Sequence, residues 1–437
     1  MCVPIFCNQD CTMALCSAPL LFTIIVVNKG GDILFFNELK FLAKSKSRLI
    51  LSILSILMSL IFCYLYLMDY STVIYYGNND SEIFYGLEAY EKQELVEKNR
   101  THRFLDENLV EEIVNNIIEL NKLEKDEEKE QFYRMISPYQ QGEYIVKRLN
   151  IDSGGKIFNR HSKSKRFYEL RNDIINKKIR NLCYGKQKLF KHLNAKIKIT
   201  FRYGKMNGWP EMLSNLSMLG LLLISILGIA SSTSFSKLYE NESDEIILST
   251  KNGRKNMVKN KILVQVIWNI VVSIICIALY LLISFRYIKL SGGDSSIQMI
   301  GLYSPYNLTL MSVLLILIVF ILLGVINSTV LANFISIDSK NSIISIGIYL
   351  IIILVHIVQT YYLKDINVGV IKLVRTGLSF LPMSSTDIYY ELLGFRALKL
   401  MNLVIPFYYA KIGVYLMGTV ILFFLCKRRV NKLGGFR

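Results

Sequence analysis

The segment from Ser231 to Lys261 lies between two long apolar runs and has an acidic half followed by a basic half. Between the two halves stand Ile246, Ile247 and Leu248, directly after Asp244 and Glu245. A short amphipathic helix here would present an apolar ridge flanked by opposite charges, which suits docking into a groove on a soluble partner. The alternative is an ordinary loop beside the membrane whose lysines only satisfy the positive-inside rule. We expect Gly253 to break the short amphipathic helix.

A second group of chemically capable residues consists of polar side chains inside the apolar runs. An amide in hydrocarbon needs a hydrogen-bond partner, so each could line a substrate path or bridge neighbouring helices, and we favour bridging. One of these residues, His356, has Gln359 nearby and can also titrate. The pathway candidates are Gln265, Asn269, Asn327, Asn333 and His356.

Motifs for catalysis and metal binding do not occur in the sequence. It contains no GxxxxGK[ST] phosphate loop, no HExxH pair and no GxSxG elbow. Its 8 cysteines lack the paired spacing of a zinc site. We therefore expect no metal and no cofactor, and a polytopic enzyme is the least supported class of function. Any ATP hydrolysis has to come from another protein.

The composition indicates a membrane protein. The chain has 437 residues, of which 52% are hydrophobic, and a net charge of +17. High hydrophobic content with strong basicity is typical of polytopic membrane proteins with basic cytoplasmic loops. Nucleic-acid binding would also explain the charge, but the cations flank apolar runs or fall in one long insert. We therefore expect the lipid bilayer as a partner and no nucleic acid.

Six apolar runs are long enough to cross a hydrocarbon core of about 30 Å at about 1.5 Å per residue. They are Leu49–Met68, Met212–Ser231, Ile262–Ser284, Leu308–Leu331, Ile343–Tyr362 and Phe407–Cys426. If the runs alternate in direction, most flanking cations fall on one side, which predicts that both termini are cytoplasmic. These cations are Lys40, Lys44, Lys46, Arg48, the 251–261 cluster, Lys340, Lys427, Arg428, Arg429 and Lys432. The expected fold is an all-α, multi-pass protein of the cytoplasmic (cell) membrane.

A family resemblance rests on the segment between the second and third runs. This segment resembles the first intracellular loop of ATP-binding-cassette (ABC) transporter permeases of the type 2, exporter-like family, in which the loop carries a coupling helix that contacts the ATPase subunit. Tyr203-Gly204 and Gly208-Trp209, before the second run, extend the similarity more weakly. The resemblance assigns ATPase coupling to Asp244, Glu245, Ile246, Ile247, Leu248, Ser249, Thr250, Gly253, Arg254 and Lys255.

The resemblance implies a permease subunit of an ATP-driven exporter. Its expected partners are a cassette ATPase subunit and a second permease subunit, in a homo- or heterodimer. The substrate stays open among peptide, lipid and drug. A different class of function is a non-transporting membrane sensor or scaffold whose external domain binds a ligand. Copurification with a cassette ATPase would separate the two.

Four regions follow from these patterns. Residues 1–30 are expected to be a leader outside the functional protein, and 31–68 an amphipathic segment followed by the first span. Residues 69–211 form a mostly helical extracytoplasmic domain, in which we expect the strand Ile197–Tyr203 to pair with Ser71–Tyr76. The basic run 156–205 could bind an anionic ligand, although a solvated helix face is favoured. Residues 212–437 hold spans two to six with the coupling loop 231–261, and the resemblance implies an outer re-entrant region at 363–406.

Overall fold

The structure is a computed structural model. The structure describes residues 31–69, 71–76, 80–97, 104–122, 140–155, 157, 167–198, 200–204, 206, 208–242, 251–288, 291–362, 369–400 and 403–433. The predicted leader at 1–30 therefore lies outside the described residues.

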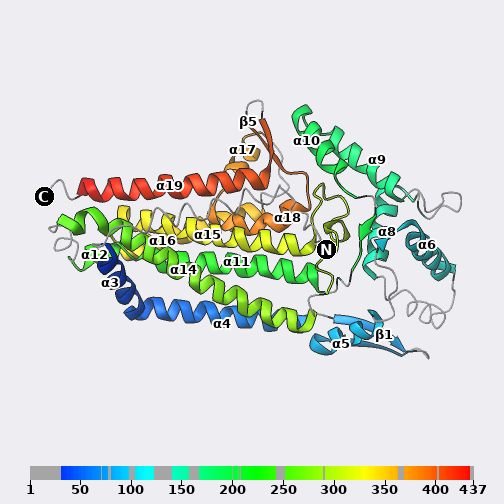
Figure 1. The fold of residues 1–437 in the computed structure, drawn as a ribbon, viewed down its shortest axis with the longest axis horizontal. Helices are drawn as coiled ribbons and strands as arrows, with labels where there is room; N and C mark the ends of the chain where they lie inside the picture. Colours follow the sequence, from blue (N-terminus) through cyan, green and yellow to red (C-terminus); the bar gives the residue numbers. More distant parts are fainter. Residues whose placement is uncertain are drawn as a thin grey trace, which may run out of the picture.

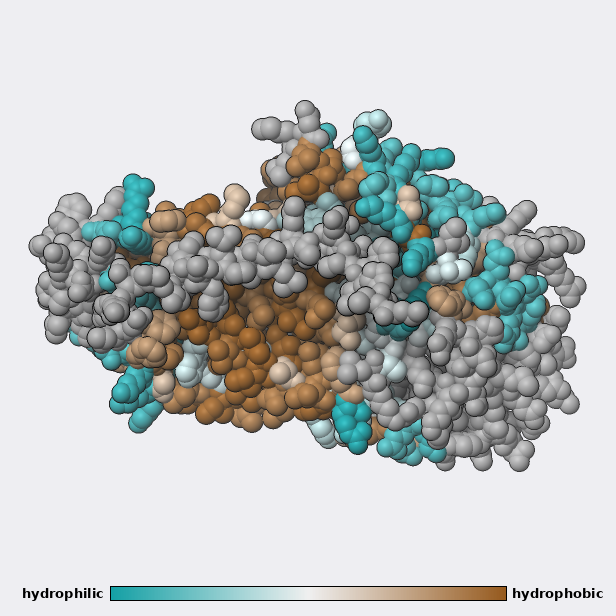
Figure 2. All heavy atoms as spheres, viewed as in Figure 1, coloured by the Kyte–Doolittle hydropathy of each residue, from teal (hydrophilic) through white to brown (hydrophobic). Residues whose placement is uncertain are grey.

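Six long helices form a bundle that fills one side of the molecule (Figure 1). They are α4 (Lys46–Asp69), α11 (Trp209–Ser232), α14 (Lys251–Ile288), α15 (Leu310–Ser339), α16 (Ser342–Tyr361) and α19 (Phe407–Leu433). Within the described residues, 6 helices are long and apolar enough to cross a membrane. Figure 2 shows the matching apolar belt along the bundle, with hydrophilic residues toward both ends. The six predicted spans are confirmed, and the chain is a multi-pass membrane protein.

The two ends of the bundle differ in what they carry (Figure 1). We call the end with α3 (Gly31–Lys44), α12 (Ser236–Glu240) and the end of α19 the elbow end, and the end with residues 71–204 the insert end. The amphipathic segment predicted before the first span is helical but is interrupted at Ser45. Its first part, α3, packs against α14, where Lys261 Nζ lies 4.0 Å from Glu38.

The predicted helix break at Gly253 is wrong. Helix α14 begins at Lys251 and continues through Gly253 as one element to Ile288. A glycine inside a helix costs only about 1 kcal/mol relative to alanine. The long apolar helix that follows offsets this cost, so glycine here lies within the first turn.

Most of the described residues of the insert between α4 and α11 are helical. Its elements are β1 (Ser71–Tyr76), β2 (Asp80–Tyr85), α5 (Gly86–Glu97), β3 (Phe104–Leu105), α6 (Glu107–Lys122), α8 (Gln140–Asp152), α9 (Phe167–Arg180), α10 (Tyr184–Ala195) and β4 (Phe201–Arg202). Leu109, Ile113 and Ile117 of α6 are buried, as their helical spacing predicts. They belong to an apolar cluster that also includes residues of the membrane helices.

The predicted pairing of Ile197–Tyr203 with Ser71–Tyr76 is wrong. Strand β1 pairs antiparallel with β2, and β4, only Phe201–Arg202, pairs with β3. The chain between β1 and β2 is Gly77-Asn78-Asn79, residue types typical of a hairpin connection. Closing so short a loop costs less conformational entropy than joining strands more than a hundred residues apart. Strand β1 therefore pairs with β2, its neighbour in sequence.

The insert is attached to the bundle through the segment 291–309, which precedes α15 and contains the 3-10 helix η4 (Ile297–Met299). Arg171 of α9 is buried and donates from Nε to Leu302 O at 2.8 Å. Arg202 pairs with Asp294 at 2.6 Å. Burial lowers the pKa of Arg171 to about 10, so the side chain is charged at neutral pH. Two arginine side chains of the insert thus bind the segment that leads into α15.

The region between α16 and α19 folds into short elements: α17 (Gly369–Leu378), η5 (Pro382–Asp387), α18 (Ile388–Leu392), β5 (Ala397–Leu400) and β6 (Leu403–Pro406). Helix η5 is almost entirely buried and packs against α11, α15 and α16. Gly324 of α15 permits this approach, because a Cβ at that position would overlap Ser385 Oγ. Helix η5 is therefore buried among three bundle helices, and we refer to it below as the re-entrant segment, after the prediction.

Candidate functional site

The short helix α12, which we call the elbow, is bonded to the membrane helices α15 and α16. The backbone N–H groups of Phe235 and Ser236 both donate to Ser336 Oγ of α15, each at 2.9 Å. The Glu240 carboxylate accepts from Ser342 N at 2.7 Å and from Ser342 Oγ at 2.8 Å, at the N-terminus of α16. A carboxylate at that position satisfies a free helix N–H and complements the helix dipole. A force on α12 would therefore act directly on α15 and α16.

Some of the predicted docking residues lie within the described part of the chain and others lie outside it. Asp244 to Thr250 lie outside the described residues, so their docking role stays a prediction. Gly253, Arg254 and Lys255 lie in the first turns of α14, close in sequence to the elbow.

Three of the five pathway candidates meet in one hydrogen-bond network beside the elbow. Asn269 Nδ2 donates to Ser231 Oγ at 3.0 Å and to Thr329 Oγ1 at 2.8 Å. Asn333 Nδ2 donates to Gln265 Oε1 at 3.1 Å, and Gln265 Nε2 donates to the hydroxyl of Ser234. The three amide side chains are buried. The network joins α11, α14 and α15, which is the bridging role that the sequence favoured.

The other two pathway candidates lie apart from this network. Asn327 Nδ2 donates to Leu323 O of its own helix at 3.1 Å. His356 Nδ1 lies 3.1 Å from Ser384 Oγ of the re-entrant segment. The five candidates therefore do not share one hydrogen-bond network, and their role in a substrate path stays a prediction.

A buried ion-pair cluster stands where His356 meets the re-entrant segment. Lys411 of α19 is 0% exposed, and its Nζ lies 2.8 Å from Glu391 Oε1 of α18, which is itself 4% exposed. Arg396 Nη1 pairs with the same oxygen at 2.8 Å. Lys411 Nζ also donates to Ser384 O at 2.6 Å. The buried Lys411 and the 37% exposed Arg396 thus share one buried carboxylate.

The cluster closes into a ring through α16. Arg396 Nη2 donates to Ser379 Oγ at 3.3 Å, and Gln359 Nε2 donates to the same hydroxyl at 3.1 Å. Gln359 stands one helical turn after His356, which reaches Ser384 on the other side of the ring. We call these residues the polar ring: His356, Gln359, Ser379, Ser384, Glu391, Arg396 and Lys411. The polar ring holds α16, η5, α18 and α19 together.

The sequence did not reveal Lys411, Glu391 or Arg396 as site residues. One signal was available, because Lys411 is a lysine five positions into the last apolar run, and ionisable residues inside spans are functional candidates. Its partners could not be read from spacing, since they lie in the irregular region 363–406.

Metal ligation finds no support in the described residues, in which no group of three or more His, Cys, Asp or Glu side chains could hold an ion. Comparison of the sequence with models of known protein families and with curated proteins gives no match.

Proposed function

We propose that the protein is the permease subunit of an ATP-driven exporter of the ABC type. It would move a peptide, lipid or drug across the cytoplasmic membrane with energy from a separate cassette ATPase. In this proposal the elbow end and both termini are cytoplasmic and the insert is extracytoplasmic. A second permease subunit, identical or different, would complete the transporter.

The observation that supports the proposal best is the attachment of α12. A short helix at the end of the bundle, between the second and third spans, is bonded to α15 and α16 through Ser336 and Ser342. The amide network joins α14 to α11 and α15. An ATPase that docks on the adjoining residues Ile246–Leu248 would therefore move four of the six spans at once.

The amide network and the polar ring have distinct roles in this proposal. The amides lie beside the elbow and keep α11, α14 and α15 together as the force is transmitted. The polar ring ties α16 and α19 to the re-entrant segment. Gln265, Asn269 and Asn333 are thus assigned to helix coupling, and direct substrate contact is not required of them.

The test is replacement of Ile246, Ile247 and Leu248 by Asp, followed by copurification with the cassette ATPase and by transport-linked ATP hydrolysis. Each apolar side chain buried at the interface would contribute about 1.5–3 kcal/mol, so assembly should weaken by orders of magnitude. The matched control is Ile151→Asp, because Ile151 is 72% exposed in the insert. Normal ATPase binding by the triple variant at matched membrane levels would contradict the proposal.

A membrane sensor is the second candidate, and one observation favours it. The insert contacts the base of α15 through Arg171 and Arg202, and α10 packs on the β5–β6 hairpin before α19. A ligand bound to the insert could therefore act on two spans. Copurification with a cassette ATPase, together with ATP-dependent movement of a substrate in reconstituted vesicles, favours the exporter, whereas the absence of both favours the sensor.

A further inference from the structure

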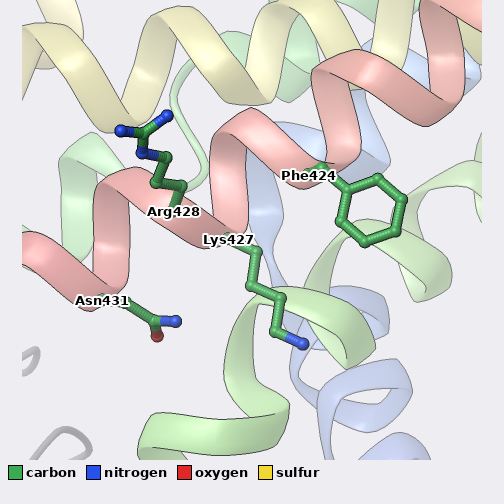
Figure 3. Close-up of a pocket in the computed structure, with 4 residues that line it drawn as sticks. All are labelled: Phe424, Lys427, Arg428 and Asn431. Carbon is green, nitrogen blue, oxygen red and sulfur yellow. The ribbon is translucent and has the colours of Figure 1, made fainter.

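A hollow of about 390 Å³ opens on the surface of α19 near the elbow end (Figure 3). Its lining residues are Phe424, Lys427, Arg428 and Asn431. At about 100° per residue, Phe424 and Asn431 stand almost in line along the helix, and the two cations leave it on either side of that line. Figure 3 shows Lys427 and Arg428 extending to opposite sides of α19. The hollow is therefore flanked by two positive charges.

An exposed apolar track leads along α19 to this hollow. Val414, Met417, Ile421 and Phe424 are 40%, 63%, 55% and 61% exposed, and their spacing of three and four residues places them on one helix face. Ten residues of helix measure about 15 Å, which is half of a hydrocarbon core of about 30 Å. The track thus has the length of one leaflet and ends at the cations.

The charge at the hollow is not neutralised within the described residues. Arg429, the next residue along, pairs with Asp338 at 3.2 Å. No described carboxylate pairs with Lys427 or Arg428, and both side chains are exposed. The hollow lies in the last two turns of the membrane-spanning part of α19, which ends at Asn431. Lipid headgroups occupy this depth in a bilayer.

We propose that the hollow and the track together bind one anionic phospholipid. The phosphate lies beside the line from Phe424 to Asn431, where the long side chains of Lys427 and Arg428 turn toward it from either side. The Asn431 amide donates a hydrogen bond to the headgroup, and an acyl chain lies along the track from Phe424 to Val414. Charge complementarity selects an anionic headgroup over a zwitterionic one. The site does not depend on whether the protein is an exporter.

The experiment titrates the full-length protein, purified in detergent, with phosphatidylglycerol or phosphatidylcholine and counts bound lipid by native mass spectrometry. The test variant is Lys427→Gln with Arg428→Gln, and the matched control is Arg429→Gln, a neighbouring cation outside the hollow. Each cation near an anionic lipid contributes a factor of about five in affinity, so the double variant should bind phosphatidylglycerol about thirty-fold more weakly. Arg429→Gln should bind it as the unaltered protein does.

A photoactivatable phosphatidylglycerol locates the bound lipid independently. Cross-links should fall within residues 414–431 and should disappear in the double variant, while phosphatidylcholine binding and the size-exclusion profile stay unchanged. Equal affinity for the two lipids would overturn the proposal, as would an equal loss in the double variant and in Arg429→Gln. Cross-linking of two protein chains through a cysteine placed at Phe424 would also overturn it, because a second copy would then cover this face.

Discussion

The buried pair of Lys411 and Glu391 makes a quantitative prediction about the stability of the membrane bundle. Replacing Glu391 by Gln removes the carboxylate that lies 2.8 Å from Lys411 Nζ. Lys411 is 0% exposed, so its charge would stay inside the protein with Ser384 O at 2.6 Å as its remaining bonded acceptor. Breaking a buried ion pair in this way costs about 3–5 kcal/mol. We expect the free energy of unfolding to fall by that amount.

Replacing Lys411 instead of Glu391 should lower the free energy of unfolding by less. Lys411→Met leaves Glu391 paired with Arg396 at 2.8 Å, so the carboxylate keeps one cation. In the double variant no charge is left buried alone, and replacing a buried ion pair by groups of similar volume is often nearly neutral. The cost of the double variant should therefore be clearly smaller than the sum of the two single costs.

The assay is an SDS titration of the protein in mixed micelles, followed by circular dichroism, for the unaltered protein and the three variants. The two single costs and the double cost form a double-mutant cycle, which isolates the interaction between the pair. A cost below about 1 kcal/mol for Glu391→Gln would refute the reasoning. Strictly additive costs would do the same, because independent side chains show no coupling.

Three further predictions concern the elbow, the insert and the orientation. Ser336→Ala removes the acceptor of two buried N–H groups, which costs about 1–3 kcal/mol for each group, and should speed hydrogen exchange at Phe235 and Ser236. Unchanged exchange at these two residues would contradict the attachment of α12 to α15. Arg171→Met removes the bond to Leu302 O and should speed exchange across residues 297–303, whereas protection equal to that of the unaltered protein would mean that the insert is held elsewhere. Cys183 is exposed, so a membrane-impermeant thiol reagent should label it in intact cells, with Cys183→Ser as the control; labelling only after permeabilisation would place the insert inside.

The spans and most helices of the insert could be predicted from sequence because their signals are local. An apolar run of about twenty residues is enough to require a helix in hydrocarbon, where every backbone N–H and C=O group needs a partner within the segment. The stripe Leu109, Ile113 and Ile117 similarly predicts which face of α6 is buried. In these cases neighbours along the chain carry the information.

The tertiary structure decided which elements meet. Strand β1 alternates in the way that a strand does, but its pattern does not name β2 rather than β4 as the partner. Gly253 looked like a helix break because its local propensity is weak, and the long helix that follows overrides it.

The polar ring shows most clearly the difference between what the sequence determines and what the tertiary structure decides. Lys411 is a charged residue in the last apolar run, a signal that our sequence-based predictions did not use, and Glu391, Ser384 and His356 come from three other elements and meet it only in the folded bundle. A buried charge needs a partner at hydrogen-bonding distance, and this distance is set by helix packing. The sequence alone therefore determined that Lys411 needs a partner, and the packing of α16, η5 and α18 around α19 decided which residue it is.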